Sequence, residues 1–326
     1  MIVTFTANPS IDRTINLTGP LQRGAVHRAS AATSHPGGKG VNVSRVVTAA
    51  GKRSIAVLPG NSSEPILLAL DEAGIDHRGI SHPGTARVNL TVTEPDGTTT
   101  KINQPGAALP PETLAALTAC LQDLAGSAVW VVLSGSLPPG VPADWYADLV
   151  TALRVGPTQI AVDTSDEPLL ALAARFPSAA PDLIKPNATE LGQLTGLDGA
   201  ELELAAEHGD PLPTARAARS LIEAGGPRAV LATLGAAGAV LVNDEGAWHA
   251  TTPPIAPRST VGAGDSSLAG YLLADLQNAG PADRLAWAVS YGSAAAALPG
   301  TALPSPHHTQ PGAVTVTALN PVIGNH

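Results

Sequence analysis

The residues best suited to chemistry lie in one short stretch, residues 259–265, which read Ser-Thr-Val-Gly-Ala-Gly-Asp. Its two glycines allow a tight turn whose backbone N–H groups can approach a ligand closely. The apolar run that follows predicts a helix, so the turn lies at a helix N-terminus. Unpaired N–H groups and the positive end of the helix dipole at such a place favour a phosphate or a developing oxyanion.

Asp265, the last residue of this stretch, has two interpretations. Aspartate at a helix start is commonly an N-cap or a first-turn carboxylate. The functional alternative is a general base beside an anion hole, where it takes the proton of a hydroxyl that attacks phosphorus. The turn alone does not decide between the two, so the rest of the chain must.

A second glycine-rich segment, residues 35–40, reads His-Pro-Gly-Gly-Lys-Gly and precedes a helix predicted over residues 41–47. It is not a Walker A loop, because Lys39 is followed by Gly40 and no glycine stands five residues before Gly38. A lysine at a helix start still suits an anionic ligand. The alternative is a flexible linker, which the abrupt start of the helix argues against.

The elements that must position these segments form a regular pattern from residue 111 onward. Predicted helices alternate there with short apolar strands, for example at residues 128–133, 159–163 and 229–233. This alternation predicts an α/β fold with a parallel sheet covered on both faces, whose ligands bind at the carboxyl ends of the strands. The Asp265 turn should lie there, together with the residues that end strands: Asn8, Ser134, Asp163, Asn187 and Leu234.

A separate small sheet is expected as a lid. Residues 86–94 and 98–103 alternate in polarity around Pro-Asp-Gly, which is a strong hairpin signal. Residues 11–17 and 26–33 are also extended and mixed in polarity. We therefore expect a single domain spanning residues 1–326, with lid strands contributed by about residues 11–34 and 86–104.

Composition excludes several classes of protein. The formal charge of −9 disfavours non-specific nucleic-acid binding, and no stretch of the 326 residues approaches a membrane span. The single cysteine, Cys120, excludes an intrachain disulfide, which fits a reducing compartment. We expect a cytoplasmic protein that binds neither nucleic acid nor membrane. The proline-rich end from Pro299 predicts a tail.

Six motifs, taken in order, resemble those of the ribokinase-like (PfkB-type) carbohydrate kinases, in the branch of the 1-phosphofructokinases and tagatose-6-phosphate kinases. They lie at residues 8–12, 37–43, 86–89, 134–138, 185–191 and 259–265. The resemblance runs nearly end to end. It implies a three-layer αβα core with a parallel central sheet, a β-sheet lid, ATP and Mg²⁺ as co-reactants, and a homodimer joined through the lid.

The resemblance also implies individual roles. Asp265 would be the general base, and Gly262, Ala263 and Gly264 would offer N–H groups to the transferring phosphoryl. The residues that would hold the sugar and its phosphate are Asp12, Gly38, Lys39, Asn42 and Arg87. The residues that would hold the nucleotide are Lys185, Asn187, Glu190, Thr233, Gly235 and Gly238. Asn187 and Glu190 would also organise Mg²⁺ through its waters, although a helix cap and a first-turn charge are their structural alternatives.

One segment departs from the family pattern. The family usually carries a Gly-Gly-x-x-Gly turn after the second core strand, and it lies near the sugar in relatives. Here residues 59–65 read Pro-Gly-Asn-Ser-Ser-Glu-Pro. The departure therefore bears on substrate preference.

The leading functional hypothesis is ATP-dependent phosphorylation of a ketohexose monophosphate, fructose 1-phosphate to fructose 1,6-bisphosphate. Lys39 and residues 102–106 and 297–300 are most similar to 1-phosphofructokinases. Tagatose-6-phosphate or fructose-6-phosphate kinase is the near alternative. A non-catalytic sugar-phosphate sensor on the same fold is a different class, and the intact Asp265 turn argues against it. A dinucleotide-dependent dehydrogenase is excluded because no Gly-x-Gly-x-x-Gly follows the first strand.

Overall fold

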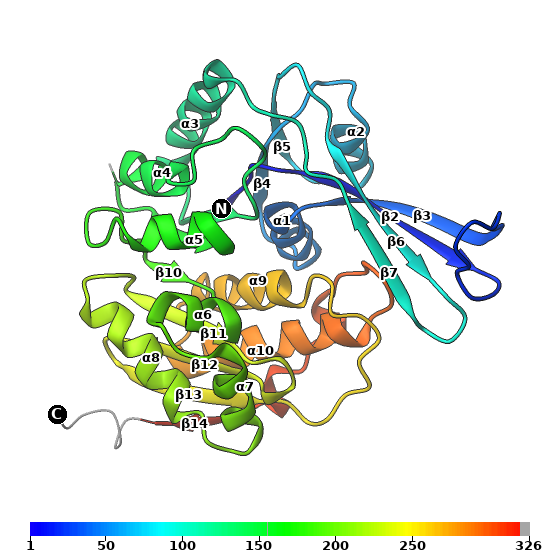
Figure 1. The fold of residues 1–326 in the computed structure, drawn as a ribbon. Helices are drawn as coiled ribbons and strands as arrows, with labels where there is room; N and C mark the ends of the chain where they lie inside the picture. Colours follow the sequence, from blue (N-terminus) through cyan, green and yellow to red (C-terminus); the bar gives the residue numbers. More distant parts are fainter. Residues whose placement is uncertain (155, 320–326) are drawn as a thin grey trace.

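A large central sheet organises the molecule. The computed structural model describes residues 1–154 and 156–319, and its 10-stranded sheet has the order β14-β13-β12-β11-β10-β9-β8-β1-β4-β5 (Figure 1). The parallel strands are β1 (Ile2–Thr6), β4 (Ser54–Pro59), β5 (His77–Ile80), β8 (Trp130–Ser134), β9 (Gln159–Asp163), β10 (Leu183–Ile184) and β11 (Ala229–Thr233). Three antiparallel strands complete one edge: β12 (Ala239–Asn243), β13 (Gly246–Thr251) and β14 (Thr315–Ala318).

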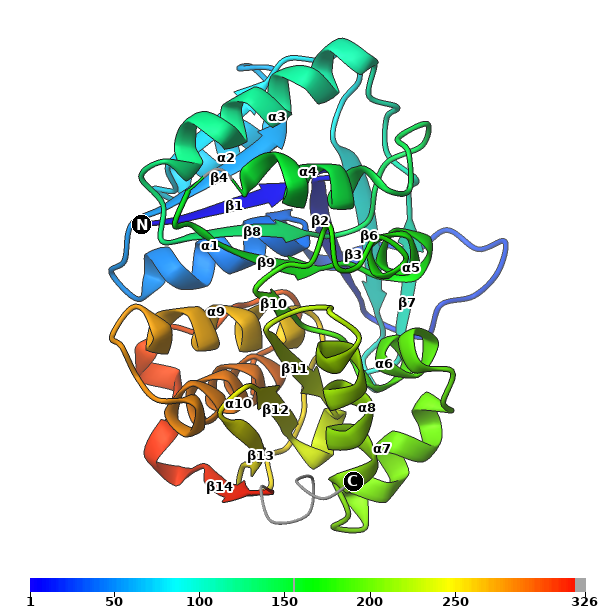
Figure 2. The ribbon, with the colours of Figure 1, turned by 90° about the vertical axis from the view of Figure 1, so that its left-hand side faces the viewer.

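Helices cover both faces of this sheet, as the short, fully apolar strands require. One face carries α3 (Pro111–Ala125), α4 (Trp145–Leu153), α5 (Asp166–Ala173), α6 (Ala188–Thr195), α7 (Gly199–Glu207) and α8 (Leu212–Glu223). The other face carries α1 (Lys39–Ala49), α9 (Ala263–Asp275) and α10 (Pro281–Ala297), while α2 (Pro65–Glu72) packs on β4 beside α1. Figure 2 shows α1 and α9 lying next to each other across the middle of the molecule.

The small sheet stands apart from this core, on the right of Figure 1. Its order is β3-β2-β6-β7, from the strands β2 (Ser10–Leu17), β3 (Ala29–Gly37), β6 (Arg87–Thr93) and β7 (Thr99–Asn103). Strand β2 pairs antiparallel with β3 and parallel with β6, so two separated segments build one lid. The covered central sheet and the separate small sheet confirm the predicted α/β architecture.

Two local predictions are corrected. Residues 35–37, expected in a glycine-rich loop, are the end of β3, because Pro36 and Gly37 pair with Ile11 and Ser10. Residues 299–319 are not a tail: they form two short 3₁₀ turns and then β14, which pairs with β13, while the rest of the predicted tail lies outside the described residues. The pairing partner of β14 lies about seventy residues away, so local composition does not reveal it. Helix α7 and strand β5 were not predicted.

Among the described residues, none of the helices combines the length and the apolar character that crossing a membrane requires.

The pair α9 and α10 anchors the segment that carries Asp265. Gly270 on α9 lies so close to α10 that a Cβ built on it would be 2.6 Å from the carbonyl oxygen of Trp287. A side chain there would push the helices apart, because interiors are close-packed. The N-terminus of α9 is thereby held against α1, with which α9 also packs.

Candidate active site

The polar residues expected at strand ends lie along one edge of the central sheet. The strand register sets Ser134 beside both Thr6 and Asp163, and Asn187 forms a parallel bridge with Thr233. The N-termini of α1 and α9 reach the same edge. Lys39 at the start of α1 contacts Asp163, and Asp265 at the start of α9 lies near enough to Asp163 to be influenced by its charge. The sheet thus gathers side chains from distant parts of the chain.

Asp265 lies in the first turn of α9 but does not cap that helix. Gly262 is the N-cap, with φ of 75°, a left-handed conformation that favours glycine. The Asp265 side chain is buried, and its Oδ2 accepts a hydrogen bond of 2.8 Å from Nδ2 of Asn42 on α1. The amides of the first turn have no intrahelical acceptor, and of these the Ala263 N–H donates to the carbonyl of Thr260 just before the helix, at 3.4 Å.

The electrostatic surroundings of Asp265 set its protonation. Burial raises its pKa to about 6, and the nearby Asp163 charge acts in the same direction. Lys39, the Asn42 hydrogen bond and Lys185 act in the opposite direction. The carboxyl group is therefore ionised at neutral pH and still basic enough to accept a proton, which is what a general base needs.

Asp163 links two lysines at the base of this site. Its Oδ1 lies 2.8 Å from Nζ of Lys39, and its Oδ2 lies 3.3 Å from Nζ of Lys185. Burial disfavours ionisation of Asp163, but the two lysines outweigh it and hold its pKa below the usual range. Burial likewise acts against the charge on Lys39, and Asp163 and Asp265 outweigh it, so the pKa of Lys39 is raised. Asp163 and Lys39 therefore stay charged together.

Lys39 is the first residue of α1. A cation there is opposed by the positive end of the helix dipole, so it needs a carboxylate partner, which Asp163 supplies. The preceding Gly38 has φ of 107°, and a Cβ built on it would lie 2.6 Å from the methyl group of Thr6. A side chain does not fit at residue 38, which lets the start of α1 lie directly against β1.

Lys39 and Lys185 face a cavity of about 500 Å³ at the N-terminus of α9. Asp265 and Gly264 line the same cavity, as do Asn187 and Glu190. Asn187 and Glu190 form a capping box: Glu190 N donates to Asn187 Oδ1, and Asn187 N donates to Glu190 Oε2, each at 2.8 Å. The structural alternative for this pair is therefore realised, with the Glu190 side chain bordering the cavity.

These oxygens also determine how a metal ion could be held. No group of three or more His, Cys, Asp or Glu side chains within residues 1–154 and 156–319 is arranged to hold one. Mg²⁺ typically keeps several of its waters and uses one or two carboxylates together with substrate phosphates. The carboxylates that line this cavity are those of Glu190, Glu203 and Asp265, and Glu190 together with substrate phosphates fits that mode of binding.

A second, mostly apolar cavity of about 610 Å³ adjoins the first and shares Thr233, Gly235 and Gly264 with it. Its walls include Pro253, Ile255 and Val289, while Gly238 lines it near β12. Apolar walls with a few polar groups are typical of sites for small planar ligands. The expected nucleotide residues Thr233, Gly235 and Gly238 all line it.

On the lid, Asp12 and Arg87 lie on neighbouring strands. Asp12 Oδ1 accepts hydrogen bonds from Ser10 Oγ at 2.7 Å and from Asn89 Nδ2 at 3.0 Å. Arg87 donates from Nη1 to the carbonyl of Gln104 at 3.2 Å, but its buried Nε has no partner in the described part of the chain. Burial lowers the pKa of Arg87, while Asp12 raises it. The guanidinium thus has donors left for an anion.

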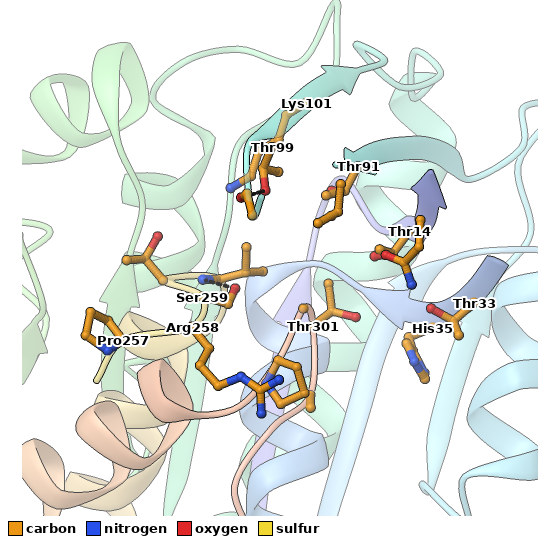
Figure 3. Close-up of a pocket in the computed structure, with 18 residues that line it drawn as sticks. Thr14, Thr33, His35, Thr91, Thr99, Lys101, Pro257, Arg258, Ser259 and Thr301 are labelled. Carbon is orange, nitrogen blue, oxygen red and sulfur yellow. Dashed lines mark hydrogen bonds between the residues drawn. The ribbon is translucent and has the colours of Figure 1, made fainter. Parts of the chain in front are cut away.

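A third cavity, of about 970 Å³, separates the lid from residues 257–261 and 299–302. Figure 3 shows Lys101, Thr91 and Thr99 reaching into it from the lid, opposite Arg258 and Ser259. Its ionisable lining residues are His35, Lys101 and Arg258, and none of the residues that line it is a carboxylate. The cavity therefore suits an anionic, hydroxyl-rich ligand.

Several residues of the site were not singled out from the sequence. Asp163 was placed at a strand end but given no role. Arg45, which donates from Nη1 to Asn42 Oδ1 at 3.3 Å, and Asn89 were also missed. Arg258 precedes the Asp265 turn directly, and its position beside a glycine-rich turn was the available signal.

A buried carboxylate at a glycine-rich helix N-terminus with lysines beside it is an arrangement suited to phosphoryl transfer. The family model described as "pfkB family carbohydrate kinase" matches residues 6–308. The chain therefore belongs to the PfkB family of carbohydrate kinases.

Relatives are similar over nearly the whole chain. A 1-phosphofructokinase of Rhodobacter capsulatus is 35% identical over 98% of this chain and 99% of its own length. A 1-phosphofructokinase of Xanthomonas campestris is 36% identical over 85% of each chain. Among solved structures, phosphofructokinase-2 from Escherichia coli in complex with substrates and products is similar with a TM-score of 0.84 and 30% identity, over 94% of this chain and 96% of its own.

The substitution Asp163→Asn tests the buried charge cluster. It leaves Lys185 buried without a counterion, so we expect the free energy of unfolding in urea at pH 7 to fall by about 3–5 kcal/mol. The control is Asp144→Asn, which removes a half-exposed partner of Arg175 and should change stability by no more than about 0.5 kcal/mol. Equal stabilities of the two variants would contradict the assignment.

Proposed function

We propose that this PfkB-family kinase transfers the terminal phosphoryl of ATP to fructose 1-phosphate, giving fructose 1,6-bisphosphate in the cytoplasm. The observation that carries the proposal is Asp265, a buried carboxylate with a raised pKa at the N-terminus of α9. The names of the Rhodobacter and Xanthomonas relatives support the choice of substrate.

In this proposal Asp265 accepts the proton of the C6 hydroxyl as the oxygen attacks phosphorus. Asn42 holds the carboxylate in place through its 2.8 Å hydrogen bond. The backbone N–H groups of Gly262, Ala263 and Gly264 receive the charge that develops on the transferring phosphoryl. The helix start holds these donors close together, and the Ala263 N–H would exchange its 3.4 Å contact with the Thr260 carbonyl for the phosphoryl.

The sugar phosphate would lie between the core and the lid. Asp12 and Asn42 would bind its hydroxyls, with the backbone of Gly38 close by. Arg87 would hold the existing phosphate with its Nε, which has no acceptor among the described residues. Lys39 contacts Asp163 and lines the cavity of about 500 Å³. It would therefore neutralise the charge of the transferring phosphoryl rather than orient the sugar ring.

ATP would occupy the two joined cavities, its base against the apolar walls of the larger and its phosphates beside Lys185. Thr233, Gly235 and Gly238 would line the nucleotide. Asn187 and Glu190 would hold Mg²⁺ through its waters. When bound, this ion supplies charge neutralisation on the terminal phosphates.

Fructose 6-phosphate is the second candidate acceptor, since a relative that is 31% identical over 95% of this chain is named an ATP-dependent 6-phosphofructokinase, and phosphofructokinase-2 from Escherichia coli, similar over 92% of this chain, has been solved in complex with fructose-6-phosphate. Tagatose 6-phosphate has the same charge and nearly the same shape. A coupled ATPase assay with these sugar monophosphates ranks them directly by kcat/KM. A sensor without catalysis would bind them and hydrolyse or transfer nothing.

The substitution Asp265→Asn removes the proposed base. We expect kcat to fall by roughly 10²–10⁴-fold, with KM values little changed. Since the base works only when deprotonated and the pKa of Asp265 is about 6, wild-type kcat should decline as pH falls below that value. Asp275→Asn, at the other end of α9, is the control and should keep this acid limb. A variant at residue 265 with near-normal kcat would remove Asp265 from the chemistry.

The substitution Arg87→Ala tests the phosphate contact. A charge-assisted contact contributes about 1.5–3 kcal/mol, so KM for fructose 1-phosphate should rise roughly tenfold to a hundredfold. KM for ATP and the weak activity on free fructose should hardly change. Arg78→Ala, at an exposed arginine of β5, is the control. Wild-type enzyme that uses free fructose as well as its phosphate would refute the contact.

A homodimer joined through the lid completes the proposal. The face of β6 opposite the third cavity carries Leu90 and Val92. Ile102 on β7 pairs with Leu90, and its side chain is 58% exposed. Such a face calls for a cover. We expect a dimer in sedimentation at micromolar concentration that Ile102→Asp weakens and Leu204→Asp, at a residue 52% exposed on α7, leaves intact. A wild-type monomer at that concentration would exclude this dimer.

A further inference from the structure

The turn that departs from the family pattern contains a buried carboxylate. Glu64 is 5% exposed and occupies the N-cap position of α2. Its side chain does not bond to the helix it precedes. Instead it turns toward residues 81–86, the segment that connects β5 to β6 of the lid. A buried carboxylate needs hydrogen-bond donors, and this segment provides one of them.

Both oxygens of Glu64 are used. Oε1 accepts from the backbone N of Asn61 at 3.0 Å and from its Nδ2 at 3.1 Å. Oε2 accepts from the backbone N of Ala86 at 3.0 Å. Asn61 joins the same segment, because its Nδ2 donates to the carbonyl of His82 at 2.9 Å and its Oδ1 accepts from Ser81 at 2.5 Å. The turn therefore grips residues 81–86 at three points.

His82 closes the network from the other side. Its buried ring accepts from the backbone N of Gly84 at Nδ1, at 3.1 Å. Burial lowers the pKa of His82, although Glu64 raises it, so the ring is neutral at pH 7. With Nδ1 accepting, the proton is on Nε2, which faces Glu64 Oε1 at 3.9 Å.

The gripped segment ends where Arg87 begins. Ala86 directly precedes Arg87, which is the first residue of β6 and pairs with Ser10 of β2. Arg87 borders a narrow gap beside Pro59 and His82 that has only about 10 Å³ of free space. Fixing the Ala86 amide fixes where the Arg87 side chain starts, and the pairing of β6 with β2 sets the face of the sheet from which it projects.

We infer that Glu64 is a positioning residue, which clamps residues 81–86 so that Arg87 faces the phosphate of the sugar substrate. The inference rests on the proposed function only for the identity of the ligand. A glycine, which the family pattern has in this turn, would offer no carboxylate to Ala86. In this chain the Glu64 side chain therefore links residues 81–86 to the start of α2.

The test compares Glu64→Gln and Glu64→Gly with the wild-type full chain. Glu64→Gly removes the acceptors of two backbone amides and of the Asn61 side chain, and Glu64→Gln replaces one carboxylate oxygen with a donor. Either change should raise KM for fructose 1-phosphate roughly tenfold, with KM for ATP and kcat changed less than about twofold. The control is Asp182→Asn, another buried carboxylate that accepts from a backbone amide, that of Ile160, far from the lid. It should reduce stability and leave all KM values unchanged.

A double-mutant cycle separates positioning from a purely structural role. In the Arg87→Ala background, Glu64→Gln should add almost nothing to KM, because the side chain that it positions is gone. Full additivity of the two KM effects would overturn the inference. An unchanged KM in both Glu64 variants would also overturn it.

Hydrogen exchange gives a readout that needs no turnover. The Ala86 amide should exchange at least roughly tenfold faster in Glu64→Gln than in wild type, while amides of β9 stay protected. If Glu64→Gln does not fold, Asn61→Ala, which removes two links to the same segment, should show the same KM shift and faster exchange. Wild type that phosphorylates no sugar phosphate would refute the proposed function, and the exchange result would still decide the clamp. Equal exchange in wild type and variant would refute the clamp.

Discussion

The site depends on one buried carboxylate, Asp163, which holds two lysines at the end of the central sheet. A buried charge is tolerated only when opposite charges and hydrogen bonds surround it. Asp163 makes it possible for Lys39 to begin α1 against the helix dipole and for Lys185 to lie beside Gly264. Its own negative charge also contributes to the raised pKa of Asp265. One residue thus fixes both the cations and the basicity of the site.

Asp265 and Asp163 show how environment separates two carboxyl groups in one cavity region. Asp163 faces two ammonium groups directly, so its pKa lies below the usual range. Asp265 has an amide partner, Asn42, and feels the lysines only at longer range, so burial dominates and its pKa rises to about 6. Pairs of acids whose surroundings push their pKa values apart are typical of sites that handle protons. One group can then hold charge while the other exchanges a proton.

Much of the fold and part of the site could be predicted from the sequence, because local patterns and short motifs determine them. The buried parallel strands, the Pro-Asp-Gly hairpin and the glycine turn before Asp265 are each set by neighbouring residues. What escaped prediction depends on contacts between distant segments. β14 is defined by pairing with β13, Asp163 by its two lysines, and the lid cavity by Lys101 and Arg258, 157 positions apart in the chain. No spacing rule connects such residues before the fold is known.

The distribution of charge explains how an acidic protein can attract anionic ligands to one cavity. The chain carries 18 Lys and Arg against 27 Asp and Glu, and both proposed ligands are anions, so the molecule as a whole repels them. The cavity under the lid reverses this locally, because its lining has the cations Lys101 and Arg258 and no carboxylate, while burial and the charge of Arg45 lower the pKa of His35. Exposed charges are screened beyond a distance of roughly 8–10 Å in physiological salt, whereas charges inside a cleft are screened less. A few cations under the lid therefore outweigh a larger number of acids on the outside, and an anionic ligand is attracted to the cleft rather than to the surface in general.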